Sequence, residues 1–563
     1  MYVGMVLVAE FTKEEEEDSC YSKKSVQYKR KLQGLSKRVL LHKWKIPSVW
    51  PRLYAESLSC SPTGVSPSQK GLVLGCYVRH GDRTGETLTL TKTASKFNDI
   101  VKGKLLEQLK AAKPPPAKCE VRTFFGLDTE FPYVSVVGLD DGCLGYNERE
   151  GINDEMECVR NAAALGTKSL LNFDLQKIYL ESFESAQNSA EGASMGMWSY
   201  DELKSRENKK ALPKIELYDS CDWYEWQIGL QKGAAQNLTR QLQDIPANLL
   251  TPKSFARQAV TLLSNQGIDV IVRAKRFMES RKMNGLLAVS SGSCEEPQLL
   301  ECTYEGCDMN APPIVLIAPG LTYNSGGLGS LRTCSLQKYV RGEVSGAACL
   351  ISVLRAVSAL ELKLNIKAFI PLSENIIGSG AMEPGAVVDM KKLTVLVKDT
   401  AKANQLIVAD VLTMIASDSC YKPHMLLDLG PYSDRTEVWT TQAVGAFTSN
   451  DSLMESLRAA AMKTGDRVWR LPLWKQASVQ MTSAAQEVDV VNSMPIFGGF
   501  AMQAAAFLQQ FVPLAVPWLH LEIGGLLRTN GLDAAYLAPG MSGRPTRTLI
   551  ELLGQMTCPQ PTK

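Results

Sequence analysis

The chain has 563 residues, of which 45% are hydrophobic and 21% are charged, and its formal net charge is +2. This length suffices for two or three domains with separate cores, and the composition excludes a disordered or fibrous chain. A net charge so close to zero argues against a nucleic-acid-binding protein that relies on bulk positive charge.

The fourteen cysteines form no C-x-x-C pair, which argues against zinc fingers, zinc ribbons and thioredoxin-like redox motifs. We expect reduced, mostly buried thiols in an intracellular compartment. The four histidines lie far apart in the sequence and offer little for a His-rich metal site or a Ser–His–Asp triad. No apolar run reaches the length that a bilayer requires, and the best candidate, 502–518, is interrupted by polar residues and two prolines.

Residues 1–70 have the composition of an extension. An acidic run at 14–18 precedes a basic, Ser-containing segment at 22–52 whose composition is that of a mitochondrial transit peptide. A transit peptide begins at the initiator methionine, however, and here the acidic run stands before it. Two interpretations stay open: the true start lies downstream, or the segment is an ordinary solvated basic arm.

Two α/β regions follow, joined by a helical linker. In the first, 71–220, strands are predicted at 71–78 and 133–139 and a helix at 155–171, and this alternation indicates a mostly parallel sheet. The linker, 221–265, is predicted to be helical, with a turn at 245–248 and a helix start at 251–255.

The second region, 266–563, is predicted to be another α/β unit, with a clear helix at 342–362. Its predicted strands are 314–318, 366–372, 393–397, 424–429 and 518–525. The first of them leads into TYNSGG (322–327), which we interpret as a loop of the kind that presents active sites in α/β enzymes. Yet 314–331 contains no Asp, Glu, Lys, Arg or His.

Several stretches, taken together and in order, resemble the cytosolic leucine aminopeptidase family. They are NLTRQLQDIPANLLTP (237–252), TYNSGG (322–327), IPLSEN (370–375), TGDRVWRLPL (464–473), WLHLEIGG (518–525) and GMSGRPTRTLIELL (540–553). RTFFGL and FPYVSVVGL resemble the amino-terminal domain of the same family. The resemblance implies a smaller amino-terminal α/β domain, a helical linker and a larger carboxy-terminal α/β domain of catalytic type. It also implies hexamers that use two divalent metal ions to release amino-terminal residues from peptides.

The first metal-binding motif of that family departs from its pattern here. The family's G-K-G-[IV]-T-F-D-S-G-G is matched by A-P-G-L-T-Y-N-S-G-G, so Pro319 stands at the metal-binding Lys and Asn324 at the metal-binding Asp. The lysine that polarises the substrate carbonyl falls on Leu331 or Arg332, because a one-residue insertion blurs the register. Arg332 would keep the charge.

The other two motifs are altered as well. The family's R-A-D-M-G-G-A-A begins here at Arg341, and its Asp becomes Glu343. The family's N-T-D-A-E-G-R-L-I-L-A-D is matched by residues 399–410. The substituted positions of this third motif are Ala401 and Ala403 for the Asp and Glu that hold both metals, Gln405 for the catalytic Arg, and Lys402 as an added cation between them.

A two-metal site needs compensating negative charge, because two divalent cations close together repel strongly. One carboxylate and one amide do not supply it, especially beside a lysine. We therefore expect no metal, no other cofactor and no aminopeptidase turnover of the family kind. A residual cleft would contain Asn324, Glu343, Arg341 and Lys402.

A retained scaffold with a lost site predicts a catalytically inactive homologue with a structural or assembly role. The profile of lost ligands is most similar to the insect sperm leucyl aminopeptidase-like proteins, which are structural components of the sperm tail associated with its mitochondrial derivatives. This resemblance implies a homo-hexamer, or a hetero-oligomer with related subunits. It also implies an intracellular location, mitochondrial or sperm-tail associated, with the cytoplasm as the alternative.

Two other functions are kept as alternatives. One is an active leucyl aminopeptidase that binds Zn²⁺ or Mn²⁺ through substitute ligands such as Asp399, Glu374 or Asp389. The other is a peptide- or anion-binding module that uses the emptied cleft. Nucleic-acid binding by the amino-terminal domain is the weakest version, because the net charge is close to zero.

Overall fold

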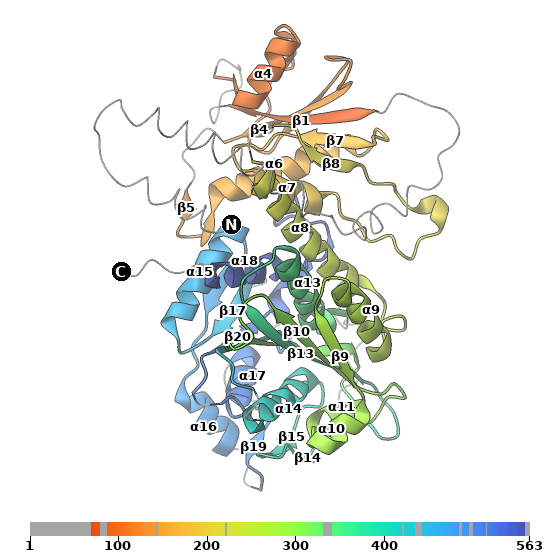
Figure 1. Cartoon of the computed structure of the whole chain (residues 1–563), viewed down its shortest axis with the longest axis vertical. Helices are drawn as coiled ribbons and strands as arrows, with labels where there is room; N and C mark the ends of the chain where they lie inside the picture. Colours follow the sequence, from red (N-terminus) through yellow and green to blue (C-terminus); the bar gives the residue numbers. More distant parts are fainter. Residues whose placement is uncertain are drawn as a thin grey trace, which may run out of the picture. The chain divides into compact units, whose positions relative to one another are not determined.

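The structure is a computed structural model of the chain (Figure 1). It describes residues 69–78, 87–140, 145–219, 222–329, 341–418, 421–433, 442–483, 487–494, 499–513 and 515–557. The predicted extension lies almost wholly outside this part, so its interpretation as a transit peptide stays a prediction. One unit comprises Gln69–Tyr200 and Lys214–Thr557. A second unit includes Asp201–Pro213, in which the structure describes the 3-10 turn η3 (Arg206–Asn208).

The amino-terminal sheet has the strand order β3-β4-β1-β7-β8, with β2 added against β1. β1 runs parallel to both β4 and β7, whereas β3 is antiparallel to β4. β1 and β4 are buried along most of their length, as expected for strands covered by helices on both faces. The prediction of a mostly parallel sheet is confirmed. The strands are β1 (Lys70–Tyr77), β2 (Thr89–Leu90), β3 (Val121–Phe125), β4 (Tyr133–Leu139), β7 (Lys177–Leu180) and β8 (Lys214–Leu217).

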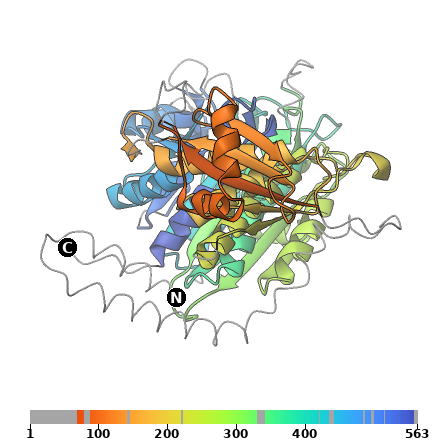
Figure 2. The same ribbon diagram turned by 90° about the horizontal axis from the view of Figure 1, so that it is seen from above.

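Two pairs of helices cover the two faces of this sheet (Figure 1, Figure 2). α4 (Lys92–Ile100) and α5 (Lys104–Ala111) pack on one face, and α6 (Asp154–Leu170) and α7 (Ala186–Gly196) pack on the other. Asn153 begins α6, because its side chain accepts a hydrogen bond from the Met156 backbone N–H. The acidic residues of the first turn further favour a helix start at this point.

The predicted linker consists of α8 (Trp223–Asp244) and α9 (Pro252–Ser264), separated by a turn as expected. α8 packs against both α7 and α13 (Ser345–Ala359) (Figure 1). Small residues permit the close approach to α7, since a Cβ on Gly229 would lie 2.2 Å from the Gln187 carbonyl oxygen. The linker is therefore a buried part of the body and not a flexible tether.

The carboxy-terminal sheet has the order β18-β17-β20-β16-β11-β13-β10-β9, with β12 added against β13. β11, β13, β16 and β20 run parallel, while β10 and β17 join them antiparallel. The strands are β9 (Asp269–Arg273), β10 (Gln298–Glu305), β11 (Ile314–Ile317), β12 (Gly320–Asn324), β13 (Asn365–Asn375), β16 (Met425–Gly430), β17 (Ala443–Phe447), β18 (Arg467–Arg470) and β20 (Trp518–Glu522). The predicted strands at 314–318, 366–372, 424–429 and 518–525 are confirmed within a few residues.

The predicted strand at 393–397 forms β15 (Thr394–Val397), but it belongs to a different sheet. It pairs with β14 (Ala386–Asp389) and β19 (Val490–Val491) in a separate three-stranded sheet. Lys391 has a φ of 65° between the two antiparallel strands, and this left-handed residue turns the chain back. Short two-stranded pairs complete the described strands: β5 (Tyr146–Asn147) with β6 (Ile152–Asn153), and β21 (Arg528–Thr529) with β22 (Gly540–Met541).

Helices surround the larger sheet. They are α10 (Lys275–Arg281), α11 (Asn284–Ser290), η5 (Arg341–Val344), α13, α14 (Ala403–Ser417), α15 (Asp451–Thr464), α16 (Lys475–Ser483), α17 (Phe500–Gln509), η6 (Gly524–Leu526) and α18 (Thr546–Met556). Within the described ranges, one stretch, Gly342–Ala359, is long and apolar enough to cross a membrane by length and composition, and 83% of it is buried inside the protein. This stretch is different from 502–518, which the sequence indicated as the best candidate.

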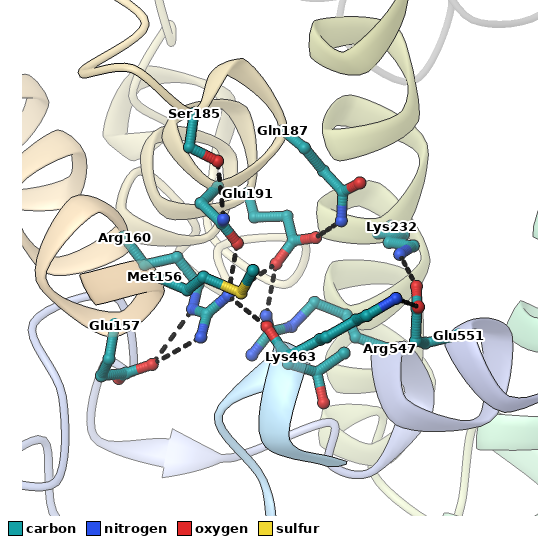
Figure 3. A network of polar contacts seen from close by, with 12 residues as sticks. Met156, Glu157, Arg160, Ser185, Gln187, Glu191, Lys232, Lys463, Arg547 and Glu551 are labelled. Carbon is teal, nitrogen blue, oxygen red and sulfur yellow. Dashed lines mark hydrogen bonds and ion pairs between the residues drawn. The ribbon is translucent and has the colours of Figure 1, made fainter. Parts of the chain in front are cut away.

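A buried charge network joins helices of the amino-terminal region to α18 (Figure 3). The Glu191 carboxylate of α7 accepts a hydrogen bond of 2.5 Å from Arg547 Nη1 and lies 3.6 Å from Arg160 Nη1. All three side chains are fully buried. Burial alone would raise the pKa of Glu191, but the Arg547 and Arg160 guanidinium groups outweigh it and hold that pKa below its usual value. The network is thus an ion triad inside the body.

A second carboxylate extends the same contact. Glu551 of α18 lies 2.5 Å from Lys232 Nζ of α8 and 3.0 Å from Lys463 Nζ of α15 (Figure 3). Burial opposes ionisation of Glu551, but the two lysines prevail and hold its pKa well below the usual range. α8, α15 and α18 are therefore tied together at one point.

Candidate functional site

The site region lies where β12 and β13 end side by side. Asn324 and Asn375 are the last residues of these parallel strands and are paired in register. The carboxyl ends of parallel strands are where α/β proteins place their ligand sites. The interpretation of TYNSGG as a loop was wrong for 322–324, which belong to β12, because pairing with β13 is a tertiary contact that local composition does not show. It was correct for Gly326 and Gly327, which follow the strand with φ of 87° and 58°.

The Asn324 side chain is fully engaged with protein atoms. Its Oδ1 accepts hydrogen bonds from the Gly326 backbone N–H, at 3.0 Å, and from Asn375 Nδ2, at 2.9 Å. Its Nδ2 donates to the Ala401 carbonyl oxygen, at 2.9 Å, and to Glu343 Oε1, at 3.3 Å. The backbone N–H and carbonyl partners fix which end of the amide is which. The one atom of Asn324 that could ligate a metal therefore has both lone pairs occupied.

Glu343 lies in η5, directly before α13, and its carboxylate faces two amides. Oε1 accepts from Asn324 and Oε2 accepts from Asn404 Nδ2 at 2.5 Å. Asn404 also donates to the Pro431 carbonyl oxygen, at 2.9 Å. Hydrogen bonds to an ionised carboxylate are among the stronger ones in proteins. Each oxygen of this carboxylate thus accepts a hydrogen bond from a neutral amide.

The third altered motif lies at the start of α14. Ala401 and Ala403 are buried, with exposed fractions of 6% and 0%, and a methyl group offers no ligating atom. Gln405 donates through Nε2 to the Asn492 carbonyl oxygen at 2.5 Å, so it is held in the core and carries no charge. Lys402 is half-buried and lines the same pocket as Glu343.

Pro319 is buried between β11 and β12. Its carbonyl oxygen accepts a hydrogen bond from the Ala347 backbone N–H at 3.2 Å, and its ring packs on Gly430, where an added Cβ would lie 2.7 Å from Pro319 Cγ. Gly430 thus makes room for the proline ring. Arg332, the candidate for the polarising cation, lies outside the described residues. Arg341 is placed in η5, but its side chain is outside the description.

A small pocket marks the place where these residues meet. It is lined by Glu343, Ala401, Lys402, Asn404, Gln405, Pro431, Tyr432 and Ser433. Its free volume of about 20 Å³ is enough for about one water molecule. Through this lining the structure brings together Glu343, Ala401, Lys402 and Gln405.

These residues do not fit a pair of divalent metal ions. Hard cations take oxygen ligands, mostly from carboxylates, and the described positions offer one carboxylate, Glu343, already facing two amide donors. Within the described residues, no group of three or more His, Cys, Asp or Glu side chains is close enough to hold a metal ion. The substitute ligands considered from sequence are engaged elsewhere: Asp399 accepts from the Ala401 N–H, and Glu374 accepts from Ser293 Oγ.

Asn375 and Asn404 were missed by the sequence reasoning. The sequence did contain a signal for Asn404. This residue stands where the family pattern has Gly, in the same motif in which Ala401 and Ala403 replace acidic residues. No comparable signal marked Asn375, since its role depends on the pairing of β12 with β13. Asn375 donates to Asn324 and Asn404 donates to Glu343, so each of these two family ligand positions accepts a hydrogen bond from an amide.

A buried polar cluster lies behind the pocket. Asp428 Oδ1 is 2.6 Å from His520 Nδ1 and accepts from the Tyr432 hydroxyl at 2.9 Å, and Asp428 Oδ2 accepts from Trp518 Nε1 at 2.6 Å. Burial, and then the Asp428 carboxylate, raise the pKa of Tyr432 well above its ordinary value. His520 is fully buried, and no hydroxyl nucleophile is bonded to its Nε2 among the described side chains. The cluster therefore holds Tyr432 in place and is not a Ser–His–Asp arrangement.

The mixed larger sheet, the smaller α/β domain before it and the altered motifs at the ends of β12, η5 and α14 define a protein of the two-domain metallo-aminopeptidase class. The family profile described as "Cytosol aminopeptidase family, catalytic domain" matches residues 237–550, and that of the "N-terminal domain" matches 73–207. The chain belongs to the cytosol aminopeptidase family. The resemblance seen in the sequence motifs and the two-domain fold that it implied are both confirmed.

Known relatives cover nearly the whole chain. The cytosol aminopeptidase of Xenopus tropicalis is 35% identical over 526 residues, which span 92% of this chain and 98% of that protein. The human cytosol aminopeptidase is 36% identical over 489 residues, 86% of this chain and 92% of that protein. Both proteins are named as aminopeptidases.

Solved structures agree with the fold. The bottromycin maturation enzyme BotP in complex with Mn superposes with a TM-score of 0.72 at 26% identity, over 86% of this chain and 99% of that one. A tomato leucine aminopeptidase mutant superposes with a TM-score of 0.70 at 20% identity, over 88% and 95% of the two chains. The second likeness concerns the fold alone.

Proposed function

We propose that this chain is a catalytically inactive member of the cytosol aminopeptidase family whose retained fold has a structural or assembly role. The observation that carries the proposal is the hydrogen bonding of Glu343 by Asn324 and Asn404 at 3.3 and 2.5 Å. Two family ligand positions, 324 and 343, are thereby joined by a direct hydrogen bond from the Asn324 amide to the Glu343 carboxylate. Pro319, Ala401 and Ala403, at the remaining positions, carry no ligating side-chain atom.

Charge supports the same conclusion. Two divalent cations held a few ångströms apart require several anionic ligands to offset their repulsion. The described site offers the Glu343 carboxylate, and Lys402 lines the same pocket. Without metals there is no activated water and no Lewis acid for the substrate carbonyl. Among the described residues that line the pocket, Glu343 is the one carboxylate that could act as a general base, and its oxygens accept from amide donors.

The test combines metal content with turnover. Elemental analysis of the purified chain is expected to find Zn and Mn well below one ion per chain, and leucine amide turnover is expected to stay at background after Mn²⁺ or Zn²⁺ is added. Human cytosol aminopeptidase, assayed in the same buffers, is the positive control. Turnover that the Glu343→Ala variant abolishes would refute the proposal, because it would show that the substituted carboxylate still supports the reaction.

The assembly role is proposed as a homo-hexamer or a hetero-oligomer with related subunits. Its support is membership of a family whose enzymes are typically hexamers. Sedimentation at micromolar concentration is expected to show a large oligomer, and a monomer would contradict the proposal. The domain limits 71–220, 221–265 and 266–563 are likewise proposed, and the matched ranges 73–207 and 237–550 support them.

The proposed location is intracellular, in mitochondria or the sperm tail, with the cytoplasm as the alternative. Its support is the resemblance to sperm proteins with the same lost ligands, together with the basic segment 22–52. Antibody staining of tissue sections tests it, and signal confined to the cytosol of other tissues would exclude the sperm-tail assignment.

Two alternatives remain as proposals of lower rank. The aminopeptidase names of the relatives favour an active enzyme that uses substitute ligands. Of these, Asp389 belongs to β14 in the separate sheet and accepts from the Lys391 N–H, so its use would require rearrangement. A peptide- or anion-binding cleft is disfavoured by the free volume of about 20 Å³, although Lys402 would suit an anion.

A further inference from the structure

Two cysteines of the amino-terminal region, Cys119 and Cys158, lie next to the end of β4. Cys119 precedes β3, and its backbone N–H donates to the Gly138 carbonyl oxygen at 2.9 Å, while the Gly138 N–H donates to the Glu120 carbonyl oxygen at 2.9 Å. The fit is close, since a Cβ on Gly138 would lie 2.1 Å from the Ala117 carbonyl oxygen. The backbone of Cys119 is therefore held firmly against β4.

Cys158 approaches the same place from α6. It belongs to the apolar cluster that includes Val137 and Leu139 of β4, so both cysteines are fixed relative to one strand end. Cys119 is hydrogen-bonded to Gly138, and Cys158 clusters with Val137 and Leu139 on either side of it, so the two cysteines adjoin the same point of β4. Both thiols are free. Cys119 is half-buried, whereas Cys158 is 7% exposed. Solvent therefore reaches the pair from the Cys119 side.

The surroundings make the two thiols chemically unequal. The hydrogen bond from Cys119 lowers the pKa of Cys158 to about 7 against the opposing effect of burial, and the Asp140 backbone and the Lys118 ammonium group assist. The pKa of Cys119 is raised correspondingly. Elsewhere burial has the opposite effect, as for Cys349, whose pKa it raises to about 12. A thiolate beside a thiol is the arrangement of redox-active cysteine pairs.

We propose that Cys119 and Cys158 form a redox-active dithiol that a hydroperoxide converts to an intramolecular disulfide. The Cys158 thiolate attacks the terminal peroxide oxygen, the O–O bond breaks, and the alkoxide leaving group takes a proton from water to depart as an alcohol. The resulting Cys158 sulfenic acid then reacts with the Cys119 thiol; an S–S bond forms, and the sulfenic oxygen leaves as water. Overall two thiols lose two electrons and two protons, and the hydroperoxide is reduced to an alcohol and water.

Peptide mapping of the full chain tests this directly. Trypsin places Cys119 on CEVR (119–122) and Cys158 on EGINDEMECVR (150–160), each with a single cysteine. After brief treatment with hydrogen peroxide and alkylation of free thiols, the expected product is the disulfide-linked pair of these peptides, and dithiothreitol is expected to release both in free form. Recovery of both peptides fully alkylated, or of Cys158 oxidised to the sulfinic acid with no link, would overturn the proposal.

Variants separate this pair from other thiols. Cys119→Ser and Cys158→Ser are each expected to abolish the link, whereas Cys294→Ser, at an exposed cysteine, is expected to leave its yield unchanged. Cys143, which lies outside the described residues, falls on the separate tryptic peptide 123–149. A link from Cys119 to Cys143 in place of Cys158 would also overturn the assignment, and because mapping uses the unaltered chain, the test does not depend on a variant folding.

Discussion

Asn404 Nδ2 lies 2.5 Å from Glu343 Oε2, and both residues line the small pocket at the start of α14. Asn324 Nδ2 donates to the other oxygen of the carboxylate, Oε1, at 3.3 Å. Each carboxylate oxygen therefore accepts a hydrogen bond from an amide, as buried polar groups usually do. These two bonds make Glu343 part of the packing between η5, β12 and α14.

The first prediction concerns that bond. Asn404→Ala is expected to lower the free energy of unfolding by about 1–3 kcal/mol, because a partly buried carboxylate loses a donor. Urea denaturation measures the change. Ser452→Ala is the matched control, since Ser452 is also the second residue of its helix but is exposed, and a change within about 0.5 kcal/mol is expected there. Equal effects of the two variants would contradict this role for Asn404.

The second prediction concerns a variant that restores one family ligand, the Asp at position 324, while the other ligand positions stay as they are. Asn324→Asp would place a second carboxylate 3.3 Å from Glu343 Oε1 and against the Ala401 carbonyl oxygen. We expect a loss of stability on the order of 3 kcal/mol near neutral pH. Mutual repulsion raises the pKa of both carboxyl groups in the folded state, so the loss should shrink as the pH falls toward 4.

Urea denaturation at pH 7.5 and pH 4.5 measures this effect, and Asn324→Ala, which removes the hydrogen bonds without adding charge, is the control. We expect the free energy of unfolding of Asn324→Asp to stay low when Mn²⁺ is added. Full recovery of stability with Mn²⁺ would reveal a surviving metal site and would count against the proposed inactivity.

The third prediction concerns the buried ion triad. The side chains of Arg160, Glu191 and Arg547 are each 0% exposed. Glu191→Gln would remove the carboxylate that the two guanidinium groups share. Removing one partner of a buried ionic group typically costs about 3–5 kcal/mol, and we expect a loss of that size in urea denaturation. Glu455→Gln, which breaks an exposed pair with Arg458, should cost less than about 1 kcal/mol. A loss at Glu191 no larger than that at Glu455 would show that the triad contributes little.

The fourth prediction is a pH dependence. Asp410 of α14 accepts a hydrogen bond from the Leu286 backbone N–H at 2.7 Å, and burial raises its pKa from 3.8 to about 8. A raised folded-state pKa means that the folded chain holds a proton that the unfolded chain releases above 3.8. The associated stability is complete below that pH and is lost as the pH rises toward 8.

Asp410→Asn has no such proton to lose. As the pH rises from 5 to 8, the free energy of unfolding of this variant should therefore increase relative to that of the unaltered chain, by up to about 1.4 kcal/mol per pH unit. Glu296→Gln, at an exposed position, is the control and should run parallel to the unaltered chain. A constant difference between the Asp410 variant and the unaltered chain across this range would disprove the titration.

Much of the fold was predictable from the sequence, because long apolar runs identify buried strands. β1, β4, β11, β13, β16 and β20 are strands whose apolar residues face packed layers on both sides, and such runs are visible in sequence. β9 and β18 were missed, since short edge strands such as DVIVR are half-exposed and carry charges. β15 was correctly predicted as a strand, but its sheet was not, because the choice of pairing partner depends on chain reversal near Lys391.

The sequence by itself determined which atoms are available at the family's ligand positions. Pro319, Ala401 and Ala403 lack ligating side-chain atoms whatever the fold, because side-chain chemistry is covalent. Only the tertiary structure decided what the remaining polar groups do. It brought Asn324 and Asn404 to Glu343, and Asn375 to Asn324, because hydrogen bonds between residues far apart in the chain exist only when strands and helices have packed.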